Sequence, residues 1–247
     1  ANNKFIINFL QTLLIISIVL TKILERIDLM NQEQQLATVK QFTVNKLAND
    51  RTGHGMDHIN RVVKNAARIA IGEGYDPFLP QVAAYLHDTV DEKIVDSVTA
   101  AQNEVKGFLQ KIGMTTEHVN TVMETIDNIS FAHTLEGHQI QLSKTAQIVR
   151  DADWLDAIGA IGITRAIYYG GAHGEVIYDP KIKPRKKMSK QEYRNLDDET
   201  IINHFDEKLL GLKDKLFTPT ARAIAEYRQQ VMLDFLHEFH QEWDAKA

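Results

Sequence analysis

Apolar side chains recur every three or four positions along most of the chain from residue 31, which is the spacing of one buried face of an α-helix. Leu36, Val39 and Leu47 illustrate it in the first such segment. Alternating strand patterns, glycine-rich phosphate loops after a strand and internal repeats are not evident. The pattern therefore predicts an all-α protein. Helices are expected over residues 32–48, 57–71, 78–89, 96–112, 115–129, 142–168, 197–213 and 219–244, with Thr115 and Thr218 as N-caps.

One region interrupts this series of helices. Residues 170–195 contain several glycines, Pro180 and Pro184, and six basic residues between Lys181 and Lys190. Such a composition predicts a long basic loop. Two interpretations of its charge remain open: a solvated loop, or a flap that brings cations over a phosphate-bearing ligand.

The N-terminal segment has a different character. Residues 5–24 are almost entirely apolar, and about 20 such residues in a helix span a bilayer core. Three interpretations compete: a membrane anchor, an apolar helix that packs on the domain or on a second copy, and a non-native extension before Met30. We therefore predict two parts, an apolar segment over residues 1–30 and a domain over residues 31–247.

Composition narrows the possible functions. The formal charge of −5 argues against a general nucleic-acid binder but permits a small anionic substrate bound by a few cations or a metal. The absence of cysteine excludes disulfides, thiol nucleophiles and cysteine zinc sites, and it is compatible with a cytoplasmic location. Any bound metal must therefore use His, Asp or Glu.

Three stretches place polar residues inside otherwise apolar helices: residues 54–62, 83–93 and 149–166. In the second, His87 and Asp88 follow a run of apolar residues, where a buried carboxylate is unfavourable unless it is paired or binds a metal. The same argument applies to Asp153 in the third stretch, which also lies among apolar residues. Imidazole and carboxylate ligands together suit Mn²⁺, Mg²⁺, Fe²⁺, Co²⁺ or Zn²⁺.

The order and local context of these residues carry a family resemblance. His58 is followed by Arg61-Val62, His87-Asp88 form a pair, and Asp153 lies in the run Asp-Ala-Asp-Trp-Leu-Asp. This H…HD…D arrangement resembles the HD superfamily of metal-dependent phosphohydrolases. The resemblance implies a helical bundle with one divalent cation, manganese favoured, on His58, His87, Asp88 and Asp153. Asp151 is the competing candidate for the last ligand, with an N-cap or a supporting contact as its other interpretation.

The likeness extends over about residues 32–243, to a bacterial subfamily of stand-alone HD proteins that includes nucleoside triphosphate pyrophosphohydrolases. After His87-Asp88, the acids Asp91 and Glu92 are similar to those of HD-type alarmone hydrolases and 5′-nucleotidases. We expect Asp91, or else Glu92, to handle the proton of the attacking water. Arg61 and Lys93 are the candidate phosphate contacts, with a structural salt bridge as the other interpretation of Arg61.

These observations predict a divalent-metal-dependent phosphohydrolase that acts on a small phosphate-containing substrate, a nucleotide by resemblance. The alternative is an HD-scaffold protein that binds nucleotides or regulates a partner without strong catalysis. No nucleic-acid partner is expected, and membrane contact is expected only through residues 5–24.

Overall fold

Helices make up the regular structure of the computed structural model, which describes residues 17, 31–48, 55–91, 94–129, 141–185 and 199–246. The predicted all-α class is confirmed: within these ranges, extended pairing is limited to one isolated bridge between Val176 and Thr200. No helix in them is long and apolar enough to cross a bilayer. Apart from Ser17, the apolar segment 5–24 lies outside the described residues, so its three interpretations stay predictions.

The elements follow one another with short connections. Thr115 and Thr218 are confirmed as N-caps, since each side chain accepts a hydrogen bond from the backbone N–H three residues later. After a helix over residues 31–47, the chain forms α2 (Met56–Gly72), α3 (Phe78–Leu86), the 3₁₀ turn η1 (His87–Val90), α4 (Val98–Lys111), α5 (Thr116–Asn128), α7 (Lys144–Asp156), α8 (Gly159–His173), α10 (Asn203–Glu207), the 3₁₀ turns η2 (Leu209–Gly211) and η3 (Lys213–Lys215), and α11 (Pro219–Trp243).

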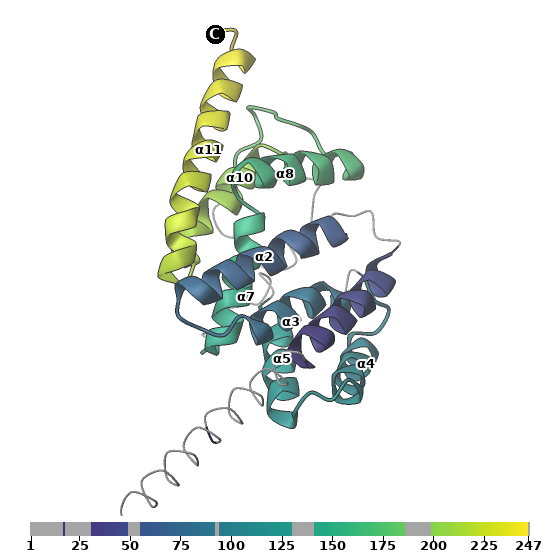
Figure 1. The fold of residues 1–247 in the computed structure, drawn as a ribbon. Coiled ribbons are helices and arrows are strands. Elements are labelled where there is room, and N and C mark those ends of the chain that lie inside the picture. Colours follow the sequence, from purple (N-terminus) through teal and green to yellow (C-terminus); the bar gives the residue numbers. More distant parts are fainter. Residues whose placement is uncertain are drawn as a thin grey trace, which may run out of the picture.

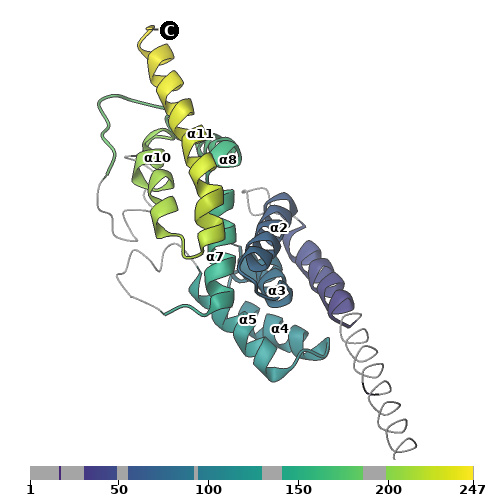
Figure 2. The ribbon, with the colours of Figure 1, turned by 60° about the vertical axis from the view of Figure 1, so that its left-hand side comes forward.

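Helices α2 and α7 form the centre of the bundle (Figure 1). α2 packs mainly against α7 and α3, and α5 packs against both α3 and α7. On the other side, α8 and α11 pack against each other, and α11 continues beyond the bundle toward the C-terminus (Figure 2). Large side chains from several of these helices are fully buried; they include Ile59, Ile69, Leu86, Leu109, Ile148, Leu155, Phe205 and Met232.

The predicted single helix over residues 142–168 is wrong, because the chain breaks it between α7 and α8. Ile158 is extended, and Gly159 adopts φ +76°, which L side chains rarely tolerate. A Cβ on Gly159 would also lie 2.9 Å from the side chain of Arg228 on α11. The glycine therefore permits both the sharp turn and the close approach of α11.

The predicted helix over residues 197–213 is also wrong in its extent. Its apolar residues Ile202, Phe205, Leu209 and Leu212 are buried as the periodicity indicates. However, the backbone leaves the α conformation at Lys208, where φ is −137°, and continues as η2 and η3. Tight 3₁₀ turns bury nearly the same positions as an α-helix, so the pattern could not distinguish the two.

Part of the expected basic loop is described. Residues 175–185 contain no helix, whereas residues 186–198 lie outside the described residues. Arg185 is ion-paired with both Glu207, at 2.5 Å, and Glu199, at 3.1 Å. The charge of Arg185 is therefore paired with carboxylates at the base of the loop. For the other basic residues of the loop, the flap interpretation stays a prediction.

Two carboxylates hold the start of α11 against the centre of the bundle. Asp151 of α7 is fully buried and accepts hydrogen bonds from the backbone N–H groups of Phe217 and Thr218 and from the Thr218 hydroxyl. Glu73, after α2, accepts from the backbone and hydroxyl of Thr220 and from Lys144. Hydrogen bonds from the Thr220 backbone, Lys144 and the Thr220 hydroxyl lower the pKa of Glu73 to about 2. Both acids therefore act as helix-joining groups.

Candidate metal centre

His58 lies in the first turn of α2, with its ring almost fully buried. Its Nδ1 lies 2.7 Å from Oδ2 of Asp156, at the end of α7. An N–H donated to that carboxylate orients the ring so that Nε2 lies on the side away from Asp156. Nε2 is 3.4 Å from Oδ2 of Asp88 and 3.5 Å from Oδ1 of Asp153. Nε2 therefore faces the carboxylates of Asp88 and Asp153.

His87 and Asp88 begin the 3₁₀ turn η1, in which the chain tightens after α3. The Nδ1 of His87 lies 2.8 Å from the backbone oxygen of Ala84, one turn earlier. Its Nε2 is buried and has no hydrogen-bond partner among the described residues, although Oδ1 of Asp88 is 3.2 Å away. Buried polar atoms rarely lack a hydrogen-bond partner, so the Nε2 of His87 is well placed to bind a cation.

Asp153, and not Asp151, faces the two histidines. Its Oδ1 lies 3.5 Å from Nε2 of His58 and 3.9 Å from Nε2 of His87. Asp151, two residues earlier, is engaged at the start of α11. Two residues on a helix are rotated by about 200° from each other, so they face nearly opposite neighbours.

The four residues predicted as ligands are thus close together. Ligand atoms of His58, His87 and Asp88 all lie within 4.8 Å of one another, so these residues could hold a metal ion. Two atoms bound at about 2.1 Å to one ion lie about 3.4 Å apart at a tetrahedral angle. The nitrogen–oxygen separations of 3.2–3.9 Å among the four residues fit that requirement.

The electrostatics of this cluster favour positive charge. Burial opposes the charge of His58, but its contacts with the carboxylates of Asp156 and Asp88 raise its pKa to about 9. Without a cation the ring is therefore protonated at neutral pH, and a bound cation would take the place of the Nε2 proton. Burial likewise opposes the charge of Asp156, whereas His58 and Arg61 lower the pKa of this carboxyl to about 2. Three carboxylates around two imidazoles therefore create a strong attraction for a cation.

Arg61 is held in an ion-pair network. Its Nε and Nη2 donate to Asp156 at 2.7 Å and 3.1 Å, and its Nη1 donates to Asp57 at 2.9 Å. The sequence allowed two interpretations of Arg61, a phosphate contact or a structural salt bridge. Since every guanidinium nitrogen already has a carboxylate partner, the described contacts favour the salt bridge.

The acid pair is only partly described. Asp91 directly follows η1, where its backbone N–H donates to Asp88, and its side chain is half-buried. It thus lies three residues after Asp88, at the end of the turn that carries the two candidate ligands, and its predicted role stays a prediction. Glu92 and Lys93 lie outside the described residues, so their predicted roles stay predictions.

Sequence reasoning missed Asp156 and Arg165. Asp156 contacts His58 and Arg61, and Arg165 of α8 donates to Oδ2 of Asp156 at 3.0 Å. A signal for Asp156 existed, because it ends the Asp-Ala-Asp-Trp-Leu-Asp run three residues after Asp153, on the same helix face. Arg165 had none, because the break before α8 sets its direction.

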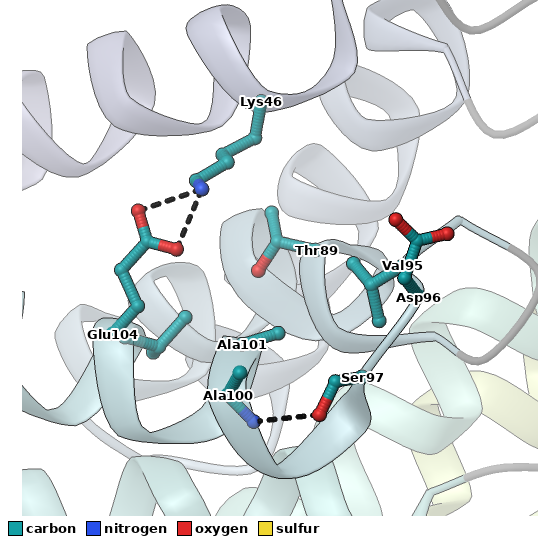
Figure 3. Close-up of a pocket in the computed structure, with 9 residues that line it drawn as sticks. Lys46, Thr89, Val95, Asp96, Ser97, Ala100, Ala101 and Glu104 are labelled. Carbon is teal, nitrogen blue, oxygen red and sulfur yellow. Dashed lines mark hydrogen bonds and ion pairs between the residues drawn. The ribbon is translucent and has the colours of Figure 1, made fainter.

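A pocket of about 260 Å³ lies beside η1, between α4 and the helix over residues 31–47 (Figure 3). Thr89, next to Asp88, forms part of its wall. Lys46 spans its mouth and is ion-paired with both carboxylate oxygens of Glu104 (Figure 3). None of the four candidate ligands lines it, and its lysine is already neutralised, so it does not extend the metal centre.

Comparisons with known proteins agree with this geometry. Residues 55–158, which include all four candidate ligands, match the family model of the HD domain. YpgQ of Bacillus subtilis is 33% identical over 213 residues, 86% of this chain and 96% of that protein. Its structure in complex with ADP superposes with a TM-score of 0.69, at 31% identity, over 86% of this chain and 96% of that one.

Two further structures are similar. A protein from Lactobacillus plantarum has a TM-score of 0.76 at 42% identity, covering 86% of this chain and 98% of that one. An HD-superfamily hydrolase from Bacillus thuringiensis has a TM-score of 0.70 at 34% identity, covering 87% and 99%. The likeness extends well beyond the motif, across most of the chain, and the two histidines and the Asp88 carboxylate converge as a metal-binding motif requires. This chain therefore belongs to the HD superfamily of hydrolases, which are generally metal-dependent phosphohydrolases.

Proposed function

We propose that this protein hydrolyses a phosphate ester or anhydride bond of a nucleotide, using one divalent cation bound by His58, His87, Asp88 and Asp153. The observation that carries the proposal is the convergence of two imidazole Nε2 atoms and two carboxylates at 3.2–3.9 Å. Each imidazole has an acceptor on its other nitrogen, which favours the ligating tautomer at Nε2. Manganese is our favoured cation.

The nucleotide part of the proposal rests on similarity. YpgQ, which is alike over most of both chains, was solved in complex with ADP. A nucleoside diphosphate or triphosphate also suits a site whose carboxylates need a cation before an anion can approach. We therefore include nucleoside triphosphate pyrophosphohydrolysis among the reactions to be tested.

Each residue has a chemical role in this proposal. A divalent cation bound there polarises a phosphoryl oxygen and lowers the pKa of water. Asp91 accepts the proton of the attacking water, with Glu92 as the second candidate, and Lys93 contacts a substrate phosphate. The water oxygen forms a bond to phosphorus, the phosphorus–oxygen bond to the leaving group breaks, and the leaving oxygen takes up a proton.

A product-resolved assay tests the proposal. The purified protein is incubated with Mn²⁺ and, separately, nucleoside triphosphates, monophosphates and cyclic nucleotides, and released phosphate and pyrophosphate are measured apart. Turnover that chelation abolishes is the expected result. Pyrophosphate would identify attack at the α-phosphorus of a triphosphate, and phosphate would identify a phosphatase.

Matched variants make the assay specific. His87→Ala and Asp88→Ala should abolish turnover, whereas His237→Ala, which removes an exposed histidine of α11, should leave it unchanged. Full activity in His87→Ala and Asp88→Ala would overturn the metal-site proposal. Nucleotide binding without any turnover would instead support the regulatory alternative.

A further inference from the structure

Asp156 contacts the side of the His58 ring that faces away from the other candidate ligands. Its carboxylate is only 2% exposed, and Oδ2 lies 2.7 Å from Nδ1 of His58. The other ring nitrogen, Nε2, is the one 3.4–3.5 Å from Asp88 and Asp153. Asp156 is therefore outside the candidate ligand set, yet it contacts one of its members directly.

The Asp156 carboxylate is itself fixed from two other helices. Arg61 of α2 donates to Oδ1 from Nε and to Oδ2 from Nη2, a two-point contact at 2.7 Å and 3.1 Å. Arg165 of α8 donates to Oδ2 at 3.0 Å. Two-point guanidinium contacts fix the plane of a carboxylate, and the two arginines offset the unfavourable burial of its charge. Neither the position nor the rotation of Asp156 is left free.

The two histidines differ in how they are oriented. The Nδ1 of His87 contacts the backbone oxygen of Ala84, which the end of α3 provides whatever the side chains are. The Nδ1 of His58 depends on a carboxylate 98 residues away in the sequence. A side-chain substitution can therefore remove the support of one histidine and leave that of the other intact.

We propose that Asp156, clamped by Arg61 and Arg165, is a positioning residue that holds His58 with Nε2 directed at the cation. This inference rests on the metal site of the proposed function, but not on the nature of the substrate. The carboxylate accepts the Nδ1 proton and thereby fixes both the tautomer and the plane of the ring. Contacts of this kind change metal affinity by about 10–100-fold when they are removed.

Asp156→Asn is the informative variant because it keeps the shape of the side chain. A carboxylate offers acceptors on both oxygens, whereas an amide must turn its NH₂ group toward either His58 or Arg61, both of which are donors here. Mn²⁺ titrated into the metal-free full-length protein by calorimetry should show a dissociation constant about 10–100-fold above the wild-type value. Saturating Mn²⁺ should restore much of the lost turnover.

Asp151→Asn is the matched control. It makes the same substitution in the same helix, at a carboxylate that is also fully buried but contacts only the start of α11 among the contacts described. We expect it to lower the resistance to urea while the folded protein binds Mn²⁺ as wild type does. The two variants thus separate a general loss of stability from a specific loss of metal affinity.

Three results would overturn the inference. Wild-type affinity in folded Asp156→Asn would show that His58 needs no carboxylate. Equal losses of Mn²⁺ affinity in Asp156→Asn and Asp151→Asn, in proportion to their stability, would show a purely structural role. Failure of the wild-type protein to bind Mn²⁺ would remove the site itself. If Mn²⁺ binds and Asp156→Asn weakens it, but no nucleotide is hydrolysed, only the proposed function fails.

Discussion

Helix α7 carries two groups of aspartates that face different neighbours. Asp151 faces the start of α11, where its hydrogen-bond donors are two backbone amides and a hydroxyl. Asp153 and Asp156 face α2 and η1, where their neighbours are imidazole rings and, for Asp156, guanidinium groups. All three residues are aspartates, and they lie within six consecutive positions of one helix. What differs is the charge of the groups that surround them.

This difference separates structural from chemical roles. Neutral donors satisfy Asp151, and burial raises its pKa above the ordinary value. At Asp156 the surrounding cations more than offset burial, so its pKa falls to about 2. A buried carboxylate among backbone amides joins two helices, whereas carboxylates that converge with imidazole rings form a candidate cation site.

The largest expected effect comes from Asp153→Ala. Removing one of four candidate ligands should raise the Mn²⁺ dissociation constant by at least about 100-fold, beyond the range seen for supporting residues, and abolish turnover. Its side chain is 29% exposed, so the free energy of unfolding should change by less than about 1 kcal/mol. Calorimetry and urea unfolding measure the two quantities. Retained Mn²⁺ affinity would exclude Asp153 from the ligand set.

The opposite pattern is expected for Asp151→Ala. The backbone N–H groups of Phe217 and Thr218 lose their acceptor inside the bundle, which should reduce the free energy of unfolding by about 2–3 kcal/mol. Mn²⁺ affinity of the folded protein should stay within about twofold of wild type. A large loss of affinity with unchanged stability would reverse the assignment of the two aspartates.

Glu73→Gln tests the structural side of the comparison through pH. The folded-state pKa is about 2, below the ordinary 4.5, so the ionised carboxylate stabilises the fold fully above pH 4.5. That contribution is lost as pH falls through 2. Glu73→Gln should therefore be less stable by about 1–2 kcal/mol at pH 7, and its deficit should shrink below pH 4.5.

Urea unfolding at pH 7, 4.5 and 3 measures this deficit. Glu226→Gln serves as the control, since Glu226 pairs with Lys213 on the surface and should contribute less than about 0.5 kcal/mol. A Glu73→Gln deficit that does not change between pH 4.5 and 3 would contradict the low pKa.

An effect as small as that of Glu73→Gln is expected at the break between α7 and α8, which directs Arg165 toward Asp156. Gly159→Ala forces a side chain into the left-handed region beside Arg228 and should destabilise the protein by about 1–2 kcal/mol. Gly171→Ala, within α8 with open space around it, should stabilise by about 0.5–1 kcal/mol. Thermal unfolding distinguishes the two signs, and equal signs would contradict the strain at Gly159.

Much of the architecture was predictable because helices are local. The apolar periodicity and the caps Thr115 and Thr218 placed most helices, since each signal lies within a few residues of the element it forms. The break at Ile158-Gly159 and the 3₁₀ turns after Lys208 were not predicted. Both depend on how closely α11 and the core approach, and periodicity carries no information about such contacts.

The sequence by itself determined the all-α class and the order of the motif residues His58, His87-Asp88 and Asp153, because these follow from local spacing and residue type. Only the tertiary structure decided that Asp153 faces the histidines while Asp151 joins α11, and that Asp156 supports His58 between two arginines. Those contacts join residues as far apart as 98 positions. Their geometry arises from the packing of α2, α7 and α8, which no local pattern specifies.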